Sequence, residues 1–293
     1  MIEADVEVYR SSSRRACEER ALVLGAVGIA SAMVLQGDHF ILEVAGADVD
    51  RAARHLTQYE AENRPADPPP PAPPLHSNAW VGCVGYAAWL TGVAYAISNG
   101  FVRLDAFQTG ELHAARVQSG QWWRAWTALT LHLSGPHLAA NLGAGIWFGY
   151  LAGRQLGVGF AWLLIVAGGG LANLLEGLFA PPWHRSVGAS TAVFTALGLM
   201  SAYTWRERRP LTQNWVQRWG PLVAGVVLLA WLGTAGKDTD VMAHALGFGI
   251  GLLLGATAAV PSISQRLHRA SQWPAGLAAI IIMAAAWALA LAS

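Results

Sequence analysis

The sequence predicts an all-α polytopic membrane bundle preceded by a small soluble α/β domain. Hydrophobic residues make up 54% of the chain and charged residues 13%, well under the roughly 25% charged residues of soluble domains. Acidic residues are concentrated at the start, since twelve of the 18 lie before Pro68. The remainder carries apolar stretches, most of which approach the ~20 residues that a helix needs to span a bilayer.

Residues 1–64 are expected to form the small α/β domain. The pattern predicts a helix over 17–30, strands over 32–36 and 40–45 that turn at Gly37-Asp38, and a helix over 48–62. Asp48 is the expected N-cap of the second helix. The apolar face of that helix is predicted to hold Val49, Ala52, Ala53 and Leu56. No chemistry is visible here, so we interpret this domain as a regulatory or docking unit.

A proline-rich linker, semi-rigid and extended, is expected over residues 65–78. It separates the first domain from a six-helix membrane core over 79–260, which is followed by a loop and an extra C-terminal transmembrane helix over 261–293. The first 20 residues are polar and contain no apolar core typical of a signal peptide. We therefore expect the N-terminus to stay in the cytoplasm of a bacterial cell, with the core in the inner membrane.

The membrane spans are predicted at 79–98, 137–153, 159–178, 189–205, 219–236, 240–260 and 273–292. Two of them, 137–153 and 189–205, are short, which fits helices whose outer ends lie in a protein cavity instead of lipid. Basic residues favour a cytoplasmic N-terminus. The inner loops would hold Arg154, Arg206, Arg208, Arg209, Arg218, Arg266 and Arg269, and the outer loops Arg103, Arg116, Arg124, Arg185 and Lys237. Three of the outer five belong to the long loop 99–136.

The overall charge and the cysteines exclude several classes of partner. A net charge of +1 gives no reason to expect nucleic acid as a ligand. Cys17 and Cys83 lie in different regions and support neither a disulfide framework nor a metal site. No His-Glu-x-x-His motif is present, so a motif-based metalloprotease is not supported. We expect no metal and no organic cofactor.

Ser190 and His244 are the candidates for covalent chemistry. Both lie at the ends of apolar stretches, where nucleophilic or ionisable side chains are costly and tend to mark function. A Ser with a His to deprotonate it is the minimum apparatus for covalent hydrolysis. Gly188-Ala189 precedes Ser190, and small residues with free N–H groups at a helix start can stabilise a developing oxyanion. Such small-residue triplets are also common in membrane helices.

His244 is followed by Gly247, Gly251 and Gly255 on about the same helix face. A stripe of small residues allows another helix to pack at close range and would bring His244 against a neighbouring backbone. A lone intramembrane His could equally be a donor between helices. Asp240, four residues before His244, is either an orienting partner of that ring or a carboxylate of the outer surface.

His137 and Asn141 are spaced i, i+4, so they share a helix face, and both can donate hydrogen bonds to an oxyanion. A metal site of His132, His137 and His184 is the rival interpretation. Upstream, Trp122-Trp123-Arg124 forms an aromatic and basic cluster that is typical of anchoring at a membrane surface.

Four motifs in a fixed order resemble those of the rhomboid intramembrane serine proteases, and the resemblance covers residues 79–260. The motifs are Trp123-Arg124, His137-x-x-x-Asn141, Gly188-x-Ser190 and His244-x-x-Gly247-x-x-x-Gly251. The resemblance implies that Ser190 is the nucleophile and His244 the general base of a dyad without a carboxylate. It implies an oxyanion hole of His137, Asn141 and the Ser190 backbone N–H. It places Phe194 against the catalytic His, and Trp123 and Arg124 in a first loop that lies partly in the outer leaflet. The implied partners are transmembrane protein substrates and the bilayer.

Two positions depart from the family pattern. Thr191 follows the nucleophile where the family usually has Gly, and its branched side chain is expected to narrow the site or slow the reaction. Ala128 stands near the place of a further first-loop His. The alternatives to a protease are a catalytically inactive rhomboid-like protein that binds transmembrane helices and, more distantly, a small-solute transporter.

Overall fold

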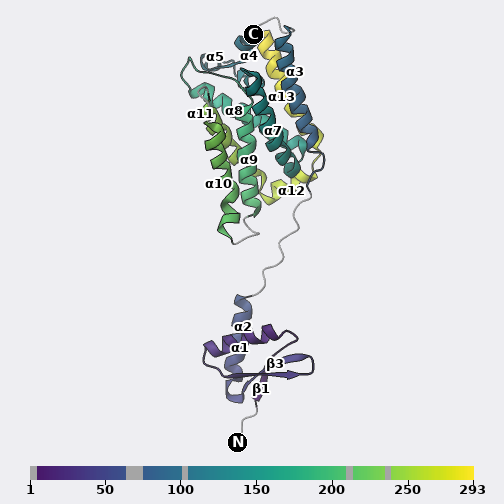
Figure 1. Cartoon of the computed structure of the whole chain (residues 1–293), viewed down its shortest axis with the longest axis vertical. Helices are drawn as coiled ribbons and strands as arrows, with labels where there is room; N and C mark the ends of the chain where they lie inside the picture. Colours follow the sequence, from purple (N-terminus) through teal and green to yellow (C-terminus); the bar gives the residue numbers. More distant parts are fainter. Residues whose placement is uncertain (1–4, 64–74, 101–104, 209–213, 235–238) are drawn as a thin grey trace. The chain divides into compact units, whose positions relative to one another are not determined.

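The computed structural model describes residues 5–63, 75–100, 105–208, 214–234 and 239–293. The chain divides into two compact units, Met1–Pro68 and Pro69–Ser293 (Figure 1). Most of the expected linker, 65–74, and the basic residues Arg103, Arg209 and Lys237 lie outside the described residues.

The N-terminal unit is a three-stranded antiparallel sheet with two helices. Its elements are β1 (Asp5–Ser11), α1 (Arg14–Ala26), β2 (Ser31–Gln36), β3 (His39–Ala45), the short 3-10 turn η1 (Gly46–Asp48) and α2 (Val49–Glu62). β3 is the central strand, paired with β1 on one side and β2 on the other. The core consists of apolar side chains from both helices and the sheet: Leu24, Ile29, Leu42, Val44, Ala52 and Leu56.

Three details of this unit differ from expectation. Strand β1 was not predicted, because its alternation of polar and apolar residues rests on Val6 and Val8 alone. Asp48 occupies the N-cap position of α2 but makes no capping hydrogen bond, since its carboxylate pairs instead with Arg51 at 2.7 Å. Ala53 is exposed, so the buried face of α2 is formed by Ala52 and Leu56.

The second unit is a bundle of long helices, which confirms the predicted fold class. The long helices are α3 (Trp80–Ser98), α7 (Gly135–Leu156), α8 (Val158–Phe179), α9 (Ser190–Arg208), α10 (Trp215–Gly233), α11 (Val241–Ala258) and α13 (Gln272–Ala292). Five of them, α3, α8, α10, α11 and α13, are long and apolar enough to cross a membrane. The two spans predicted to be short correspond to α7 and α9, and that prediction was wrong, because these helices have 22 and 19 residues.

The segments expected to be loops contain further structure. Between α3 and α7 lie α4 (Ala106–Gly110), β4 (Leu112–His113), α5 (Ala114–Gln118), α6 (Arg124–Thr127) and the 3-10 turn η2 (Ala128–Thr130). Strand β4 pairs with β5 (Arg185–Ser186). The stretch expected as a loop after residue 260 is the amphipathic helix α12 (Pro261–Arg269). Residues 75–78, assigned to the linker, also contact this unit, since the His76 N–H donates to the Arg154 carbonyl at 2.9 Å.

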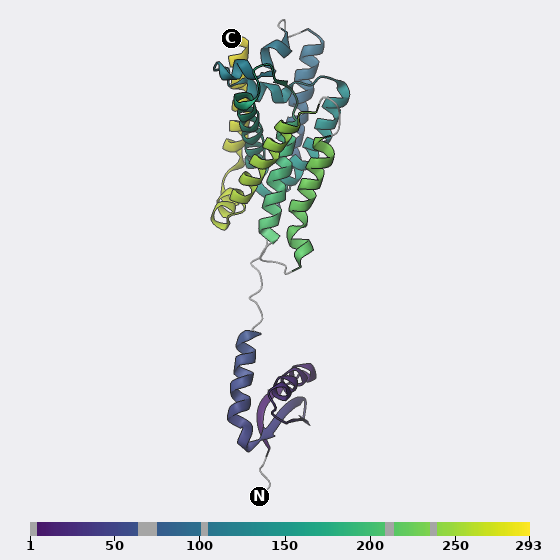
Figure 2. The same ribbon diagram turned by 90° about the vertical axis from the view of Figure 1, so that its left-hand side faces the viewer.

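Helix α9 lies among α7, α8, α10 and α11 at the centre of the bundle (Figure 2). Of these neighbours, α11 packs against α9 most closely. A Cβ added to Gly247, Gly251 or Gly255 would collide with a backbone carbonyl of α9. The two backbones therefore touch along three helical turns, as small residues permit in membrane helices.

We predict that Gly251→Ala lowers the thermal stability of the purified protein in detergent. The added methyl group would overlap the Thr195 carbonyl, and overpacking of this kind typically costs about 1–3 kcal/mol. Gly249→Ala is the matched control on the same helix, because no neighbouring atom lies within 4 Å of the added Cβ. Equal melting temperatures for the two variants would contradict the close α9–α11 contact.

Candidate active site

Ser190 and His244 meet at the end of the α9–α11 contact. Ser190 begins α9, and His244 lies in the first turn of α11. The Ser190 Oγ and the His244 Nε2 are 2.8 Å apart, and the His244 Nδ1 is 2.9 Å from the carbonyl oxygen of Gly233. A carbonyl can only accept, so Nδ1 carries the proton and Nε2 is left to accept from the serine hydroxyl. This is the arrangement that a general base requires.

Two further contacts hold the His244 ring and its helix. The Phe194 ring lies against it, with centroids 4.4 Å apart. Asp240 does not orient the ring. Its Oδ1 accepts from the Ala243 N–H at 3.1 Å and so caps α11, while its Oδ2 faces His184.

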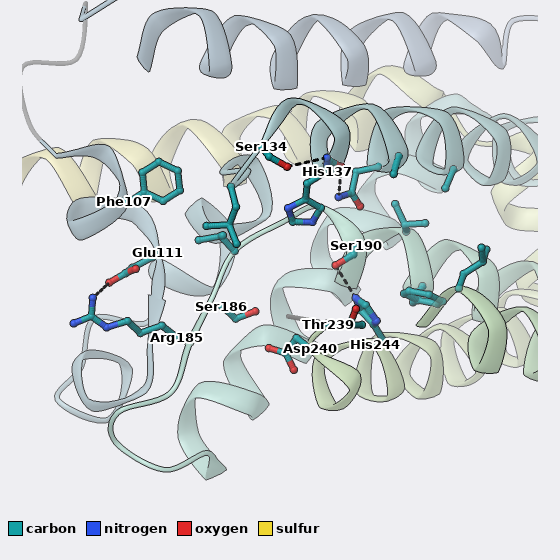
Figure 3. A pocket seen from close by; sticks show the side chains of 18 of the residues that line it. Phe107, Glu111, Ser134, His137, Arg185, Ser186, Ser190, Thr239, Asp240 and His244 are labelled. Carbon is teal, nitrogen blue, oxygen red and sulfur yellow. Dashed lines mark hydrogen bonds and ion pairs between the residues drawn. The ribbon is translucent and has the colours of Figure 1, made fainter. Parts of the chain in front are cut away.

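Ser190 and His244 line a cavity of about 620 Å³. Side chains from α7, α9 and α11 converge on it (Figure 3). Its lining includes the predicted site residues Ser190, His244, His137, Asn141 and Phe194. The sequence therefore named side chains that the fold brings to one cavity.

His137 lies over the backbone that precedes Ser190. A Cβ added to Gly188 would stand 2.9 Å from both Cε1 and Nε2 of the His137 ring. Gly188 also has a φ of +133°, a conformation that side chains rarely adopt. Glycine is therefore required here for two independent reasons, and it lets the imidazole approach the nucleophile.

Asn141 is buried on the next turn of α7, at 5% exposure. Its side-chain amide donates to the backbone carbonyl of His137 at 3.0 Å. The amide thus lies at the cavity wall with one donor hydrogen already used within its own helix, while an amide nitrogen carries two.

His132 has a contact that the sequence did not reveal. Its Nε2 lies 3.4 Å from the Ala189 N–H and accepts from it. Burial lowers the pKa of His132 to about 4, so the ring is neutral at physiological pH, as an acceptor nitrogen must be. The rival metal site of His132, His137 and His184 does not form among the described residues, since His184 faces Glu176 and Asp240 instead.

The first loop is clamped from within by Arg124. This side chain is 2% exposed and donates to the carbonyls of Gln108 and Glu111 and to the side chain of Gln121, at 2.9, 2.9 and 2.6 Å. Burial lowers the pKa of Arg124 to about 10, and the guanidinium remains charged at neutral pH. Trp123 is half-buried beside the exposed Trp122. Arg124 is therefore an internal clamp of the loop, and the lipid-anchoring interpretation does not hold for it.

Thr191 does not narrow the cavity, contrary to expectation. It is 2% exposed and is not part of the cavity lining. Its methyl group lies near Gly247 of α11, 3.3 Å from where a Cβ of that glycine would stand. The branched side chain is therefore packed between helices, behind the nucleophile.

Sequence reasoning missed part of the cavity lining. Phe107 and Glu111 from the first loop and Arg185 from the segment before Ser190 reach the cavity (Figure 3). Arg185 and Glu111 form an ion pair at 3.1 Å. They meet because β4 pairs with β5, and two-residue strands are too short to leave a periodic signal.

We predict that Arg124→Lys lowers the free energy of unfolding by about 1–3 kcal/mol. The single ammonium group of a lysine cannot reach all three acceptors that the planar, forked guanidinium binds. Arg116→Lys is the control, since Arg116 is exposed and makes one bond to the same Gln108 carbonyl. Denaturation in detergent would measure both. If the two substitutions cost the same, Arg124 is not the clamp of the loop.

The comparison with protein families covers the part of the chain that holds Ser190 and His244. A family model described as the Rhomboid domain matches residues 119–260. The match begins after α3, within the first loop, and it contains Arg124, both candidate oxyanion donors, Ser190 and His244. The chain is therefore an integral multi-pass membrane protein that carries a rhomboid domain, the domain of a family of intramembrane serine proteases in which some members are inactive.

Proposed function

We propose that this protein is an active intramembrane serine endopeptidase that cleaves transmembrane segments of membrane proteins near the outer face. One observation carries the proposal. The Ser190 Oγ lies 2.8 Å from a His244 nitrogen whose opposite nitrogen is fixed on the Gly233 carbonyl. A binding protein has no need for a hydroxyl held against a correctly oriented base.

In the proposed reaction, the Ser190 hydroxyl attacks a substrate peptide carbonyl as His244 Nε2 takes its proton. The tetrahedral intermediate then collapses. The same imidazole returns the proton to the leaving amine, and the acyl group remains on Ser190. Water from the cavity hydrolyses this ester with His244 again as base. The Gly233 carbonyl stabilises the imidazolium form by accepting from Nδ1 throughout.

The oxyanion is proposed to lie between His137, Asn141 and the Ser190 backbone N–H. As the first residue of α9, Ser190 has an N–H without a helical partner. The His137 ring lies over Gly188, and Asn141 is one turn further along α7. Three donors aimed at one point are the usual way to stabilise such a charge.

The cellular arrangement is also part of the proposal. The distribution of basic residues supports a cytoplasmic N-terminus in a bacterial inner membrane, with the cavity toward the outer face. Residues 1–64 would then be a cytosolic domain, 65–78 a linker, 79–260 the six-helix core, and 261–293 α12 and an additional transmembrane helix. The inactive, helix-binding alternative rested on Thr191, which lies outside the cavity lining.

We expect Ser190→Ala and His244→Ala each to abolish labelling by a fluorophosphonate probe and cleavage of a model transmembrane substrate in liposomes. Ser201→Ala is the matched control on the same helix, because Ser201 donates to the Leu197 carbonyl and does not line the cavity. A folded wild type that neither labels nor cleaves would exclude the protease and leave the helix-binding alternative.

We expect Asn141→Ala to lower kcat about 100- to 1,000-fold with little change in KM, as loss of one oxyanion donor does. The reason is that the donor is needed only in the transition state. Steady-state cleavage of the model substrate measures both constants. Asn99→Ala, at the exposed end of α3, should leave them unchanged. A rise in KM alone would instead assign Asn141 to substrate binding.

A further inference from the structure

A second cluster of ionisable groups lies beside the cavity and takes no part in the proposed reaction. Glu176 is in the last turn of α8, His184 follows in the connection to β5, and Asp240 caps α11. The His184 Nε2 is 3.2 Å from Asp240 Oδ2 and 3.5 Å from Glu176 Oε1. One ligand atom from each residue lies within 4.8 Å of the other two.

Glu176 is the unusual member of the cluster. It is 2% exposed, and within the described part of the chain neither of its carboxylate oxygens makes a hydrogen bond, although the His184 Nε2 lies 3.5 Å from Oε1. A buried carboxylate without hydrogen bonds is costly. A second carboxylate, that of Asp240, faces the same point, and the two repel each other whenever both are ionised. A cation between the three side chains would remove both penalties.

We propose that Glu176, His184 and Asp240 bind one divalent transition-metal ion, with zinc as the best match. Zinc takes His nitrogen and carboxylate oxygen ligands at roughly 2.0–2.2 Å, which places neighbouring ligands of a tetrahedral site about 3.4 Å apart. The two separations from the His184 Nε2, 3.2 and 3.5 Å, match this spacing, and the Glu176 and Asp240 oxygens lie within 4.8 Å of each other. Three protein ligands would leave the fourth position to water.

The proposed site lies near the surface, and an ion bound there would join three segments of the chain. The side chains of His184 and Asp240 are 28% and 19% exposed, while the ligand atoms themselves are buried, so an ion would enter past the outer edges of these two side chains. Asp240 binds with one oxygen, while its other oxygen caps the helix that carries His244. The ion would therefore join the end of α8, the connection before Ser190 and the start of α11. This metal is structural, and its binding does not depend on whether the dyad is active.

The test is zinc binding by the full-length protein without a polyhistidine tag, stripped of metal with a chelator in detergent. Zinc is then titrated in competition with a chromophoric chelator, and melting temperatures are recorded with and without zinc. We expect one zinc per wild-type chain and a higher melting temperature with zinc. Glu176→Gln and His184→Gln should each weaken binding at least about tenfold, since even partners behind the ligands have effects of this size.

His268→Gln is the matched control, because His268 stacks on His76 with centroids 5.3 Å apart and could bind zinc non-specifically. It should bind zinc as the wild type does. Asp240→Asn, whose amide oxygen can still cap α11, tests the third ligand, and gel filtration verifies folding. Absence of zinc binding by the wild type, or unchanged affinity in folded Glu176→Gln and His184→Gln, would overturn the proposal. Ser190 labelling is scored separately, so the two proposals fail independently.

Discussion

The backbone contact between α9 and α11 is the constraint on which the site depends. Each of three glycines on α11 faces a carbonyl of α9, so the helices cannot separate or slide without losing this fit. Ser190 begins one helix, and His244 lies one turn before the first of those glycines on the other. The 2.8 Å separation of nucleophile and base is thus a consequence of helix packing.

The first loop holds the backbone segment that leads into Ser190, which the contact between α9 and α11 does not hold by itself. Arg124 closes the loop on itself, and the pairing of β4 with β5 ties it to the segment that leads into Ser190. That segment is also held by the Gly188 N–H bond to the Ala128 carbonyl and by His132. These bonds fix the backbone before any substrate arrives, which is the preorganisation that electrostatic stabilisation of an oxyanion requires.

The start of α11 is held from several sides. The Gly233 carbonyl fixes the ring of His244, Phe194 packs against it, and Asp240 caps the helix. Because Asp240 also belongs to the proposed metal site, the same carboxylate connects helix capping, the cavity wall and the buried Glu176. Binding or loss of the metal would therefore act first on the first turn of α11, which carries His244.

The sequence by itself determined the membrane bundle, the positions of its long helices and the identity of the Ser, His and Asn side chains that line the cavity from them, because long apolar stretches and an ordered set of motifs are local signals. It failed where contacts join distant segments. Only the tertiary structure decided that Gly233 orients His244, that Asp240 turns to His184, that Arg124 is buried, and that Thr191 faces α11. Each of these contacts depends on which segment of the chain packs against the residue. The periodicity of one helix carries no information about the helix or loop beside it.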